Sequence, residues 1–289
     1  MNIILNRLMR LLPDRLYIAI KYLYHFKKLP NLRFPCTYNE KIQWLKLHDR
    51  KPIYNIMVDK YEAKNYVSSI VGKEYIIPSY GVWNNFDEIN FDKLPQQFVL
   101  KTTHDCGGIV ICKDKSNFNI NNAKKILNKH LNYNFFYEGR EWPYKDVKPR
   151  ILAEAYMEDS STNDLKDYKI FTFNGEPKIL FVAADRQNIN EETKFVFFDM
   201  EFNVLDIENG HPNIGCSISK PQNFDTMKIL AEKIAKYSGL SHLRVDFYEV
   251  NGRVYVGELT FYHWSGFIPF KPEKWDYILG NWLTLPKIN

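Results

Sequence analysis

The sequence predicts an α+β fold in which antiparallel strands and helices follow one another along the chain. Two Asn-Gly pairs, at 174–175 and 251–252, each join two strand-like runs, and this dipeptide is a strong signal for a β-hairpin. Helical patterns lie before and between these hairpins, so alternating βαβ units are not expected. With 289 residues, of which 45% are hydrophobic and 16% aromatic, the chain has enough apolar material for a large core or two closely packed lobes.

Hydrophobic periodicity places the individual elements. Apolar residues have helical spacing in five segments, which are 1–28, 38–49, 58–71, 120–131 and 224–238. Gly72 and Gly239 follow two of these segments, at the position where a glycine often ends a helix. Short apolar runs predict strands over 97–101, 109–112, 151–157, 168–173, 178–183 and 194–198, and a hairpin over 244–262.

The positive charge is concentrated near the N-terminus. Up to Lys51 the chain has eleven lysines and arginines and three acids, which gives +8, so the remainder carries −3 of the net +5. Because the same segment has helical apolar spacing, it can lie on an anionic membrane surface or pack on the domain with a solvated basic face. The packed helix is the commoner arrangement. No recognition module for nucleic acid accompanies the charge.

The compartment expected is the cytoplasm, and the basic segment leaves peripheral contact with the inner face of the membrane open. No apolar run approaches the roughly 20 residues of a membrane span, and no secretory signal is recognised. The cysteines have no CxxC spacing, which argues against a zinc site or a disulfide framework. They are Cys36, Cys106, Cys112 and Cys216.

Two acids occupy the hairpin over 244–262 at positions where apolar residues are expected. Asp246 and Glu258 each interrupt a hydrophobic strand, and a buried charge without a partner is costly. A shared cation, most simply Mg²⁺, would account for both acids if they face the same side. A two-residue turn at 251–252 would place them on opposite faces, so the metal hypothesis requires a connection of odd length. The alternative is a pair of solvated edge acids, one of them paired with Arg244.

A lysine precedes a glycine-bearing loop in the middle of the chain. Lys101 ends a strand, and Thr102-Thr103-His104-Asp105-Cys106-Gly107-Gly108 separates it from the next strand. The two glycines let backbone N–H groups approach an anion, and the ammonium group neutralises it, so phosphate is a suitable ligand. The spacing differs from that of a Walker A loop. An ordinary tight hairpin with an exposed lysine explains the same residues equally well.

Further charged residues stand at strand ends. Glu154 lies inside the strand over 151–157, where it either takes a ribose hydroxyl or faces water. Lys169 and Arg186 flank the hairpin around 174–175, and such cations suit phosphate or carboxylate. No nucleophile elbow or metal-ligand spacing of histidines is found. His104 and His263 are interpreted as structural, although His104 lies in the glycine loop and could contact phosphate.

Taken in order, these residues resemble the ATP-grasp superfamily, and the chain is most similar to the TupA-like (teichuronopeptide-type) ATP-grasp family of bacterial surface-polysaccharide gene clusters. The matching stretches cover roughly residues 40–275 and are specific only in combination. They are Asp59-Lys60-Tyr61, Ile77-Pro78-Ser79-Tyr80-Gly81-Val82-Trp83, Leu94-Pro95 with Phe98-Val99-Leu100-Lys101, Asp167-Tyr168-Lys169-Ile170-Phe171-Thr172-Phe173-Asn174-Gly175, Arg244-Val245-Asp246-Phe247-Tyr248 and Gly257-Glu258-Leu259-Thr260-Phe261-Tyr262.

The resemblance implies an ATP-grasp architecture, in which two lobes with antiparallel sheets clasp ATP, preceded by a helical N-terminal segment. The boundaries expected are 1–75 for the helical region, 76–157 for the small lobe with its glycine loop, and 158–289 for the large lobe with the metal site.

The resemblance also implies roles for individual residues. ATP would be bound by Lys60, Lys101, His104, Gly107, Gly108, Glu154, Tyr156 and Met157, with 154–157 forming the adenine hinge. Magnesium would be held by Asp246, Glu258 and Thr260, and this threonine stands where many ATP-grasp ligases have asparagine. The transferring phosphoryl group or the acylphosphate would be stabilised by Lys169, Arg186 and Arg244.

The function implied is that of an ATP- and Mg²⁺-dependent carboxylate–amine ligase. A substrate carboxylate would attack the γ-phosphate, and an amine would then displace phosphate from the acylphosphate to form an amide. Such phosphoryl transfer depends on positioning and charge neutralisation, which agrees with the lack of a covalent-nucleophile signature. The family context implies a sugar acid of a capsule, O-antigen or cell-wall polymer as one partner and an amino acid or another amine as the second.

Two other classes of function remain open from the sequence. One is a different transfer enzyme of the same pathway, either a sugar kinase or a glycosyltransferase, although no DxD motif beside a nucleotide-sugar unit is found. The other is a non-catalytic protein that binds a polymer or a membrane through its basic N-terminal segment.

Overall fold

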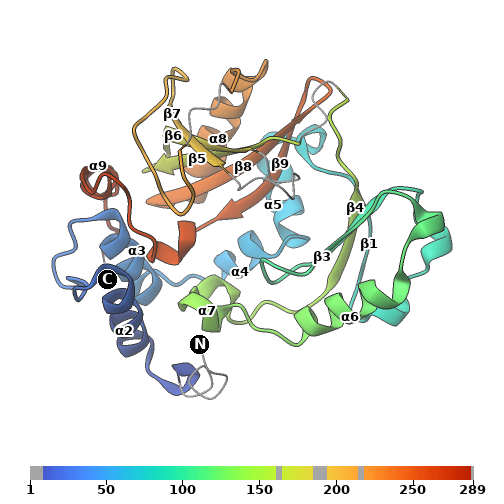
Figure 1. The fold of residues 1–289 in the computed structure, drawn as a ribbon, viewed down its shortest axis with the longest axis horizontal. Coiled ribbons are helices and arrows are strands. Elements are labelled where there is room, and N and C mark those ends of the chain that lie inside the picture. Colours follow the sequence, from blue (N-terminus) through green and yellow to red (C-terminus); the bar gives the residue numbers. More distant parts are fainter. Residues whose placement is uncertain (1–8, 161–164, 185–193, 214–217, 288–289) are drawn as a thin grey trace.

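Two antiparallel sheets lie at the centre of the computed structural model, which describes residues 9–160, 165–184, 194–213 and 218–287 (Figure 1). The small sheet has the strand order β1-β4-β2-β3, and the large sheet has the order β7-β6-β5-β8-β9. The strands are β1 Ser79–Trp83, β2 Phe98–Thr102, β3 Ile109–Cys112, β4 Ile151–Ala155, β5 Asp167–Phe173, β6 Glu176–Ala184, β7 Lys194–Asp199, β8 His242–Val250 and β9 Arg253–Thr260. The α+β class predicted from the sequence is confirmed.

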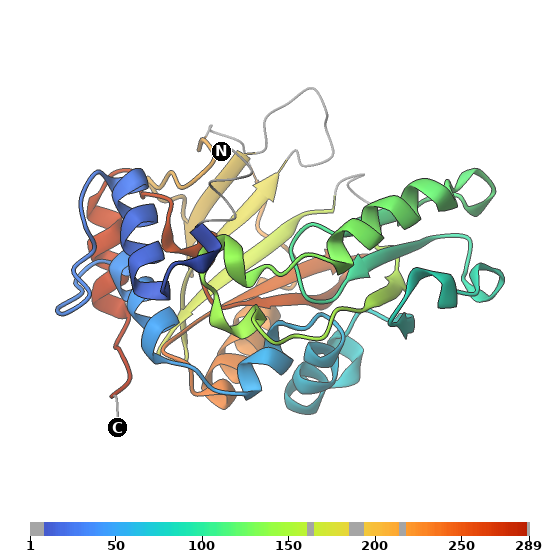
Figure 2. The same cartoon turned by 90° about the horizontal axis from the view of Figure 1, so that it is seen from below.

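Helices surround the two sheets. The α-helices are α2 Asp14–Phe26, α3 Tyr38–His48, α4 Ile53–Val58, α5 Glu62–Val71, α6 Ile120–Leu131, α7 Phe136–Gly139, α8 Phe224–Ser238 and α9 Lys274–Trp282. Short 3₁₀ helices are η1 Lys73–Tyr75, η2 Phe86–Glu88, η3 Phe91–Lys93, η4 Lys115–Asn117, η5 Trp142–Tyr144 and η6 His263–Gly266. Figure 2 shows α2, α3 and α9 at one end of the large sheet and the small sheet with α6 at the other end.

The small sheet has a buried face and a polar face. Phe98 and Leu100 of β2 belong to the same hydrophobic cluster as Leu127 of α6. Side chains alternate along a strand, so Lys101 lies on the opposite face of β2. Glu154 of β4 pairs with Val99 and therefore shares the face of Lys101. The alternation thus brings the two charged residues together, away from the core under α6.

The large sheet carries a row of charged residues across three strands. Lys169 of β5 is paired with Asp246 of β8, which is paired in turn with Glu258 of β9. Paired residues of adjacent strands point to the same side. The apolar residues that alternate with them, such as Ile170 and Val245, are fully buried in the main hydrophobic core. One face of this sheet is therefore a charged platform.

Most predicted elements are present within two residues of their expected ends, and two predicted helices differ. The helix predicted over 58–71 is two helices, α4 and α5, because the Asp59 carboxylate accepts hydrogen bonds from the backbone N–H groups of Tyr61 and Glu62 and caps a new helix start. The N-terminal helix is interrupted before α2 by Pro13. Strand β1 and helices α7 and α9 were not predicted. In the described part of the chain, no helix combines the length and apolar character that a membrane span requires.

Candidate active site between the two sheets

Asp246 and Glu258 face the same side of the large sheet, as the metal hypothesis requires. The predicted odd-length turn is wrong: Val250 pairs with Arg253 across a two-residue turn, whose residues Asn251 and Gly252 both have positive φ. The register changes further along, where Phe247 pairs with Val256 and Asp246 pairs with Glu258. Gly257 is the extra residue of this β-bulge.

Close packing explains why the bulge residue is a glycine. A Cβ atom at Gly257 would lie 2.8 Å from the ring of Tyr248 and 3.4 Å from the carbonyl oxygen of Asp246. No side chain fits there without a shift of these neighbours. The bulge therefore depends on a local contact between β8 and β9. Without its extra residue, Asp246 and Glu258 would lie on opposite faces of the sheet, and with it they lie on the same face.

Asp246 is the centre of an ion cluster and is fully buried. The Arg244 guanidinium donates to both of its carboxylate oxygens, with 2.7 Å from Nε to Oδ1 and 2.7 Å from Nη2 to Oδ2. Lys169 donates to Oδ2 of Asp246 and lies 2.6 Å from Oδ2 of Asp167. Such a bidentate arginine pair is among the strongest hydrogen-bonded ion pairs in proteins. Two cations thus compensate the buried acid.

Glu258 and Thr260 extend this cluster toward solvent. Arg244 Nη2 lies 2.9 Å from Thr260 Oγ1 and 3.4 Å from Glu258 Oε1, and Thr260 donates to Glu258 over 3.2 Å. The Glu258 side chain is 40% exposed, in contrast to the buried Asp246. Glu258 is therefore the acid of the pair that a solute can reach directly.

The ion cluster shifts the pKa values of its members in opposite directions. Burial would raise the pKa of Asp246, but Arg244 and Lys169 outweigh burial and hold the pKa below its ordinary value. Burial would lower the pKa of Lys169, and the acids Asp167 and Asp246 raise it instead. Asp246 and Lys169, like Arg244, are therefore charged at neutral pH, and the charged face of the large sheet keeps a fixed pattern of charges.

A histidine and an asparagine hold Arg244 in place. Arg244 Nη1 donates to Nδ1 of His263 over 2.8 Å, and His263 Nε2 donates to Oδ1 of Asn209 over 2.9 Å. Burial and the nearby guanidinium lower the pKa of His263 well below its usual range, so the ring is neutral. His263 is structural, as predicted, and Asn209 was not recognised in the sequence because its partner lies 54 positions away.

A second ion cluster lies on the small sheet around Glu154. Lys101 pairs with Oε1 of this carboxylate, and Lys64 of α5 lies 3.0 Å from Oε2. Burial would raise the pKa of Glu154, but the two lysines lower it. In this structure the Glu154 carboxylate therefore binds two ammonium groups. Lys64 was missed from the sequence because helical spacing alone does not show which face of α5 meets the sheet.

The glycine loop is anchored by Asp105. Its carboxylate accepts hydrogen bonds from Thr102 and from Nδ1 of His130, at the end of α6. Gly108 is packed so closely that an added Cβ would lie 2.0 Å from Thr102 Oγ1, so a side chain has no room there. Burial would raise the pKa of Asp105, and the hydrogen bonds from Thr102 and His130 lower it. The loop is thereby fixed to the sheet and to α6.

Two predicted ATP contacts lie in or beside this loop. Lys60 donates to the carbonyl oxygen of Asp105. His104 is buried, and its Nε2 donates to the carbonyl oxygens of His130 and Tyr133 at 3.2 and 3.0 Å. The His104 ring therefore uses Nε2 for a loop-to-helix contact, whereas the Lys60 ammonium lies at the pocket between the sheets.

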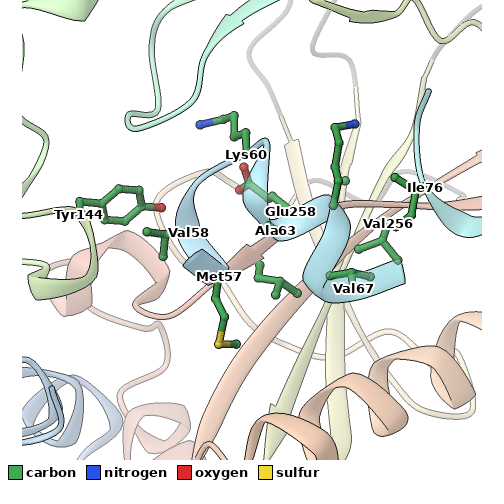
Figure 3. Close-up of a pocket in the computed structure, with 12 residues that line it drawn as sticks. Met57, Val58, Lys60, Ala63, Val67, Ile76, Tyr144, Val256 and Glu258 are labelled. Atoms are coloured by element: carbon green, nitrogen blue, oxygen red, sulfur yellow. The ribbon is translucent and has the colours of Figure 1, made fainter. Parts of the chain in front are cut away.

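The two ion clusters meet at a small pocket between α5 and β9 (Figure 3). Lys60, Lys64 and Glu258 line this pocket together with Tyr144. Figure 3 shows Lys60 and Glu258 among the residues that line it. Through Lys64 the pocket adjoins the Glu154 cluster, and through Glu258 it adjoins the Asp246 cluster.

A larger cavity of about 500 Å³ continues from Tyr144 and Glu258 over the charged platform. Lys169 and Arg244 lie in its wall, and aromatic rings form much of the remainder. The polar atoms of the platform therefore face a space that admits a small-molecule substrate.

The other predicted site residues are less closely tied to these clusters. Tyr156 and Met157 follow β4 and are partly buried, and the ammonium of Lys113 lies 5.7 Å from the Tyr156 ring centroid. Gly107 is exposed in the loop. Arg186, predicted to act on the phosphoryl group, lies outside the described residues.

Magnesium can be tested against the oxygen donors on the platform. Within the described ranges, no group of three or more histidines, cysteines and acids is arranged to hold a metal ion. Asp246, Glu258 and Thr260 supply oxygen donors on one face, which is the ligand type that Mg²⁺ prefers. Glu258 is open to the cavity, whereas Asp246 is bound to two cations. The donors fit Mg²⁺ through Glu258, with water completing the ligand set.

Three solved structures illustrate the similarity at the level of the chain trace. D-alanine–D-alanine ligase from Bacillus anthracis, complexed with ATP, is 17% identical over 71% of this chain and 55% of that chain, with a TM-score of 0.41. The ADP complex of PurK, N5-carboxyaminoimidazole ribonucleotide synthetase, is 17% identical over 76% and 49%, with a TM-score of 0.44. L-amino acid ligase from Bacillus licheniformis is 11% identical over 84% and 47%, with a TM-score of 0.44. The chain spans about half the length of these proteins.

The family assignment rests on the sequence itself. No protein of curated function matches the chain. The profile of the TupA-like ATP-grasp family matches residues 40–284, which includes both sheets, the glycine loop and the acidic hairpin. The chain therefore belongs to the TupA-like ATP-grasp family.

Proposed function

We propose that the protein is an ATP- and Mg²⁺-dependent carboxylate–amine ligase. Family membership supports an ATP-grasp enzyme, and the observation that carries the proposal is the meeting of two ion clusters at one pocket. Lys60 and Lys64 supply positive charge on one side, and Glu258 supplies an acid on the other. Phosphoryl transfer requires this combination of cations for phosphate and acids for magnesium.

The lysines are assigned to the nucleotide. Lys60, Lys64 and Lys101 neutralise phosphate oxygens, and the glycine loop at 107–108 covers them. In the structure, Lys64 and Lys101 both pair with Glu154. Tyr156 and Met157, which follow β4, contact the adenine ring. The lobes that clasp the nucleotide are 76–157 and 158–289, preceded by the helical region 1–75.

The charged platform is assigned to the reacting groups. Glu258 would hold magnesium, with Thr260 and Asp246 as the further oxygen donors on the same face, and the metal would supply neutralisation of charge on the transferring phosphoryl group. Arg244 and Lys169 face the cavity beside it and stabilise the acylphosphate. His263 and Asn209 keep the guanidinium of Arg244 in position, which reduces the reorganisation needed during the reaction. Arg186 is assigned to the same phosphoryl group.

The carboxylate substrate is assigned to the sugar acids, as in a capsule, O-antigen or cell-wall polymer. The cavity of about 500 Å³ has room for a sugar ring. Phe181, Phe195 and Trp264 line it and offer apolar ring faces, and Arg244 and Lys169 offer charge to a carboxylate. This combination favours a cyclic, polar acid over an aliphatic acid. An amino acid or another amine completes the reaction.

Nucleotide turnover tests the proposal directly. Purified protein with ATP and Mg²⁺ is expected to release ADP when a uronic acid, such as glucuronate or galacturonate, and an amine are both supplied. Either substrate alone should give little ADP. AMP as the product would contradict the acylphosphate mechanism, and ADP release with a sugar alcohol group and no amine would indicate a kinase.

We further propose that α2 makes peripheral contact with an anionic membrane surface. Leu16, Ile20 and Leu23 are exposed on one face of α2, opposite the buried Tyr22. Two exposed cations, Arg15 on α2 and Lys27 directly after its last residue, would attract anionic lipid. An apolar face bordered by cations is complementary to a phospholipid surface.

Vesicle sedimentation tests the membrane contact. The protein should sediment with phosphatidylglycerol vesicles and not with phosphatidylcholine vesicles, and Leu16→Ser combined with Leu23→Ser should abolish sedimentation. Ile229→Ser, which changes an exposed apolar residue of α8, serves as the matched control. Equal sedimentation of all variants would contradict the contact, and concentration-dependent dimerisation would assign the face to a second copy of the chain.

A further inference from the structure

A buried acid outside the predicted site lies in the wall of the large cavity. Glu141 precedes η5, is 5% exposed and lines the cavity together with Arg244 and Lys169. Among the described residues, no lysine, arginine or histidine nitrogen lies within 4.0 Å of its carboxylate. The nearby hydroxyl of Ser265 acts to lower the pKa of Glu141, against the larger effect of burial. Glu141 is therefore a buried carboxylate without a direct ion-pair partner at a substrate-sized cavity.

A buried lysine, Lys46, attracts this carboxylate through space and opposes the effect of burial on it. The ammonium of Lys46 is surrounded by oxygens, at 2.9 Å from Gln43 Oε1, 2.8 Å from the carbonyl of Gly139 and 3.1 Å from Ser265 Oγ. An ammonium group has only donors, so this environment suits the protonated form. Burial lowers the pKa of Lys46 and raises that of Glu141, and the attraction between the two opposes both shifts.

The surroundings of Glu141 favour a cationic ligand. Its charge contributes to raising the pKa of the nearby Tyr144 and Tyr262, after the larger effect of burial. Both rings line the cavity, and aromatic faces attract ammonium groups. Of the other acids in this wall, Glu138 accepts a hydrogen bond from Tyr133, and Glu258 accepts hydrogen bonds from Arg244 and Thr260. Among the described residues, no tyrosine or arginine donates a hydrogen bond to Glu141, so this carboxylate is available to a cationic ligand in addition to Glu258.

We propose that Glu141 binds the ammonium group of the amine substrate and accepts one of its protons. The inference rests on the proposed ligase function and assigns the two ends of the cavity: Arg244 and Lys169 for the acid, Glu141 for the amine. The ammonium R–NH₃⁺ transfers a proton to the Glu141 carboxylate and becomes R–NH₂. The neutral amine then attacks the acyl carbon, the C–O bond to phosphate breaks, and the second amine proton leaves with the phosphate as HPO₄²⁻.

Charged groups on the neighbouring elements influence the ionisation of Glu141. Lys46 on α3, Lys21 on α2 and Arg244 on β8 each act on Glu141 through space, and all three favour its ionised form. They oppose burial, which is the larger effect and raises the pKa of Glu141. Arrival of an ammonium group supplies the missing counter-charge, and burial favours subsequent uptake of its proton.

Binding can be measured without nucleotide or turnover. Saturation-transfer NMR with propylammonium as the probe is expected to give a saturable signal for the wild type, and 1-propanol should give none. Glu141→Gln should lose the signal, Glu141→Asp should retain part of it, and Glu138→Gln should retain it fully. Melting curves verify that each variant is folded. An equal signal from Glu141→Gln, or no saturable signal from the wild type, would overturn the inference.

A second experiment uses two nucleophiles that differ in charge. Hydroxylamine is largely uncharged at neutral pH and traps acylphosphates as hydroxamates, so it does not need Glu141. With glucuronate or galacturonate, Glu141→Gln should make hydroxamate at nearly the wild-type rate, while its KM for propylamine rises at least about tenfold. Equal losses with both nucleophiles would overturn the inference. No hydroxamate from the wild type would count against the proposed ligase function, and the NMR experiment would still decide the ammonium site.

Discussion

Asp246 and Glu258 lie directly opposite each other on adjacent strands, although the turn that joins these strands has only two residues. The turn alone would place the two acids on opposite faces of the sheet. The extra residue Gly257 restores the common face, and with it the charged platform. The candidate metal site thus depends on a one-residue bulge in the middle of β9.

Substitution of the bulge glycine should disturb stability and activity together. In Gly257→Ala the new Cβ would meet the Tyr248 ring at 2.8 Å, so the strand must shift. We expect a loss of about 1–3 kcal/mol in the free energy of unfolding and a large loss of ADP release. Urea denaturation and the nucleotide assay measure the two effects. Arg253→Ala, an exposed change on the same strand, should leave both unchanged; a neutral Gly257→Ala would show that the bulge is not required.

The two acids should respond differently to loss of charge. Asp246→Asn leaves the buried Arg244 and Lys169 without their counter-charge, so we expect about 3–5 kcal/mol of destabilisation. Glu258→Gln changes a side chain that is 40% exposed and should cost little stability while abolishing Mg²⁺-dependent turnover. Chemical denaturation and ADP release at varied Mg²⁺ separate these outcomes. Full Mg²⁺ dependence in a folded Glu258→Gln protein would exclude Glu258 as a ligand.

Lys64 should contribute to ATP binding as much as Lys60 and Lys101, the two lysines that were predicted from the sequence. Its ammonium lies between Glu154 and the pocket, so Lys64→Met removes a positive charge from the nucleotide side. We expect the KM for ATP to rise about tenfold, which corresponds to about 1.4 kcal/mol. The exposed Lys73→Met is the control. A changed free energy of unfolding with an unchanged KM would make Lys64 a purely structural partner of Glu154.

His242 should make the protein less stable in mild acid. Burial lowers the pKa of this histidine to about 3, whereas the unfolded chain has the ordinary value of 6.5. The unfolded chain therefore binds a proton between these pH values that the folded protein does not bind. The contribution of His242 to the free energy of unfolding is fully present above pH 6.5 and is lost as the pH falls toward 3. At about pH 5 this loss amounts to about 2 kcal/mol.

Unfolding experiments at about pH 7.5 and about pH 5 isolate this effect. The folded ring accepts a hydrogen bond from Tyr38 and donates one to the carbonyl oxygen of Thr172, both at 2.9 Å. Since His242→Asn has no titrating ring, its loss of stability between the two pH values should be about 2 kcal/mol smaller than that of the wild type. The same pH dependence in both proteins would assign the acid sensitivity to other groups.

The sequence by itself determined most of the elements and most of the charged candidates. Asn251 and Gly252 specify a tight turn because both adopt positive φ. Lys101 and Asp246 stand out because a charge inside an apolar strand demands a partner. These are local properties, which depend on near neighbours in the chain and on the alternation of side chains along a strand.

Only the tertiary structure decided which charges meet. Lys64 reaches Glu154, and Glu141 comes to lie beside the same cavity as Arg244, across separations of about a hundred residues. The bulge at Gly257 likewise depends on the Tyr248 ring of the neighbouring strand. Pairing between distant segments is selected by the packing of two sheets as a whole, because each contact gains energy only when the others are present. Local sequence patterns therefore identify the charged residues, and the packing of the whole fold determines which of them contact one another.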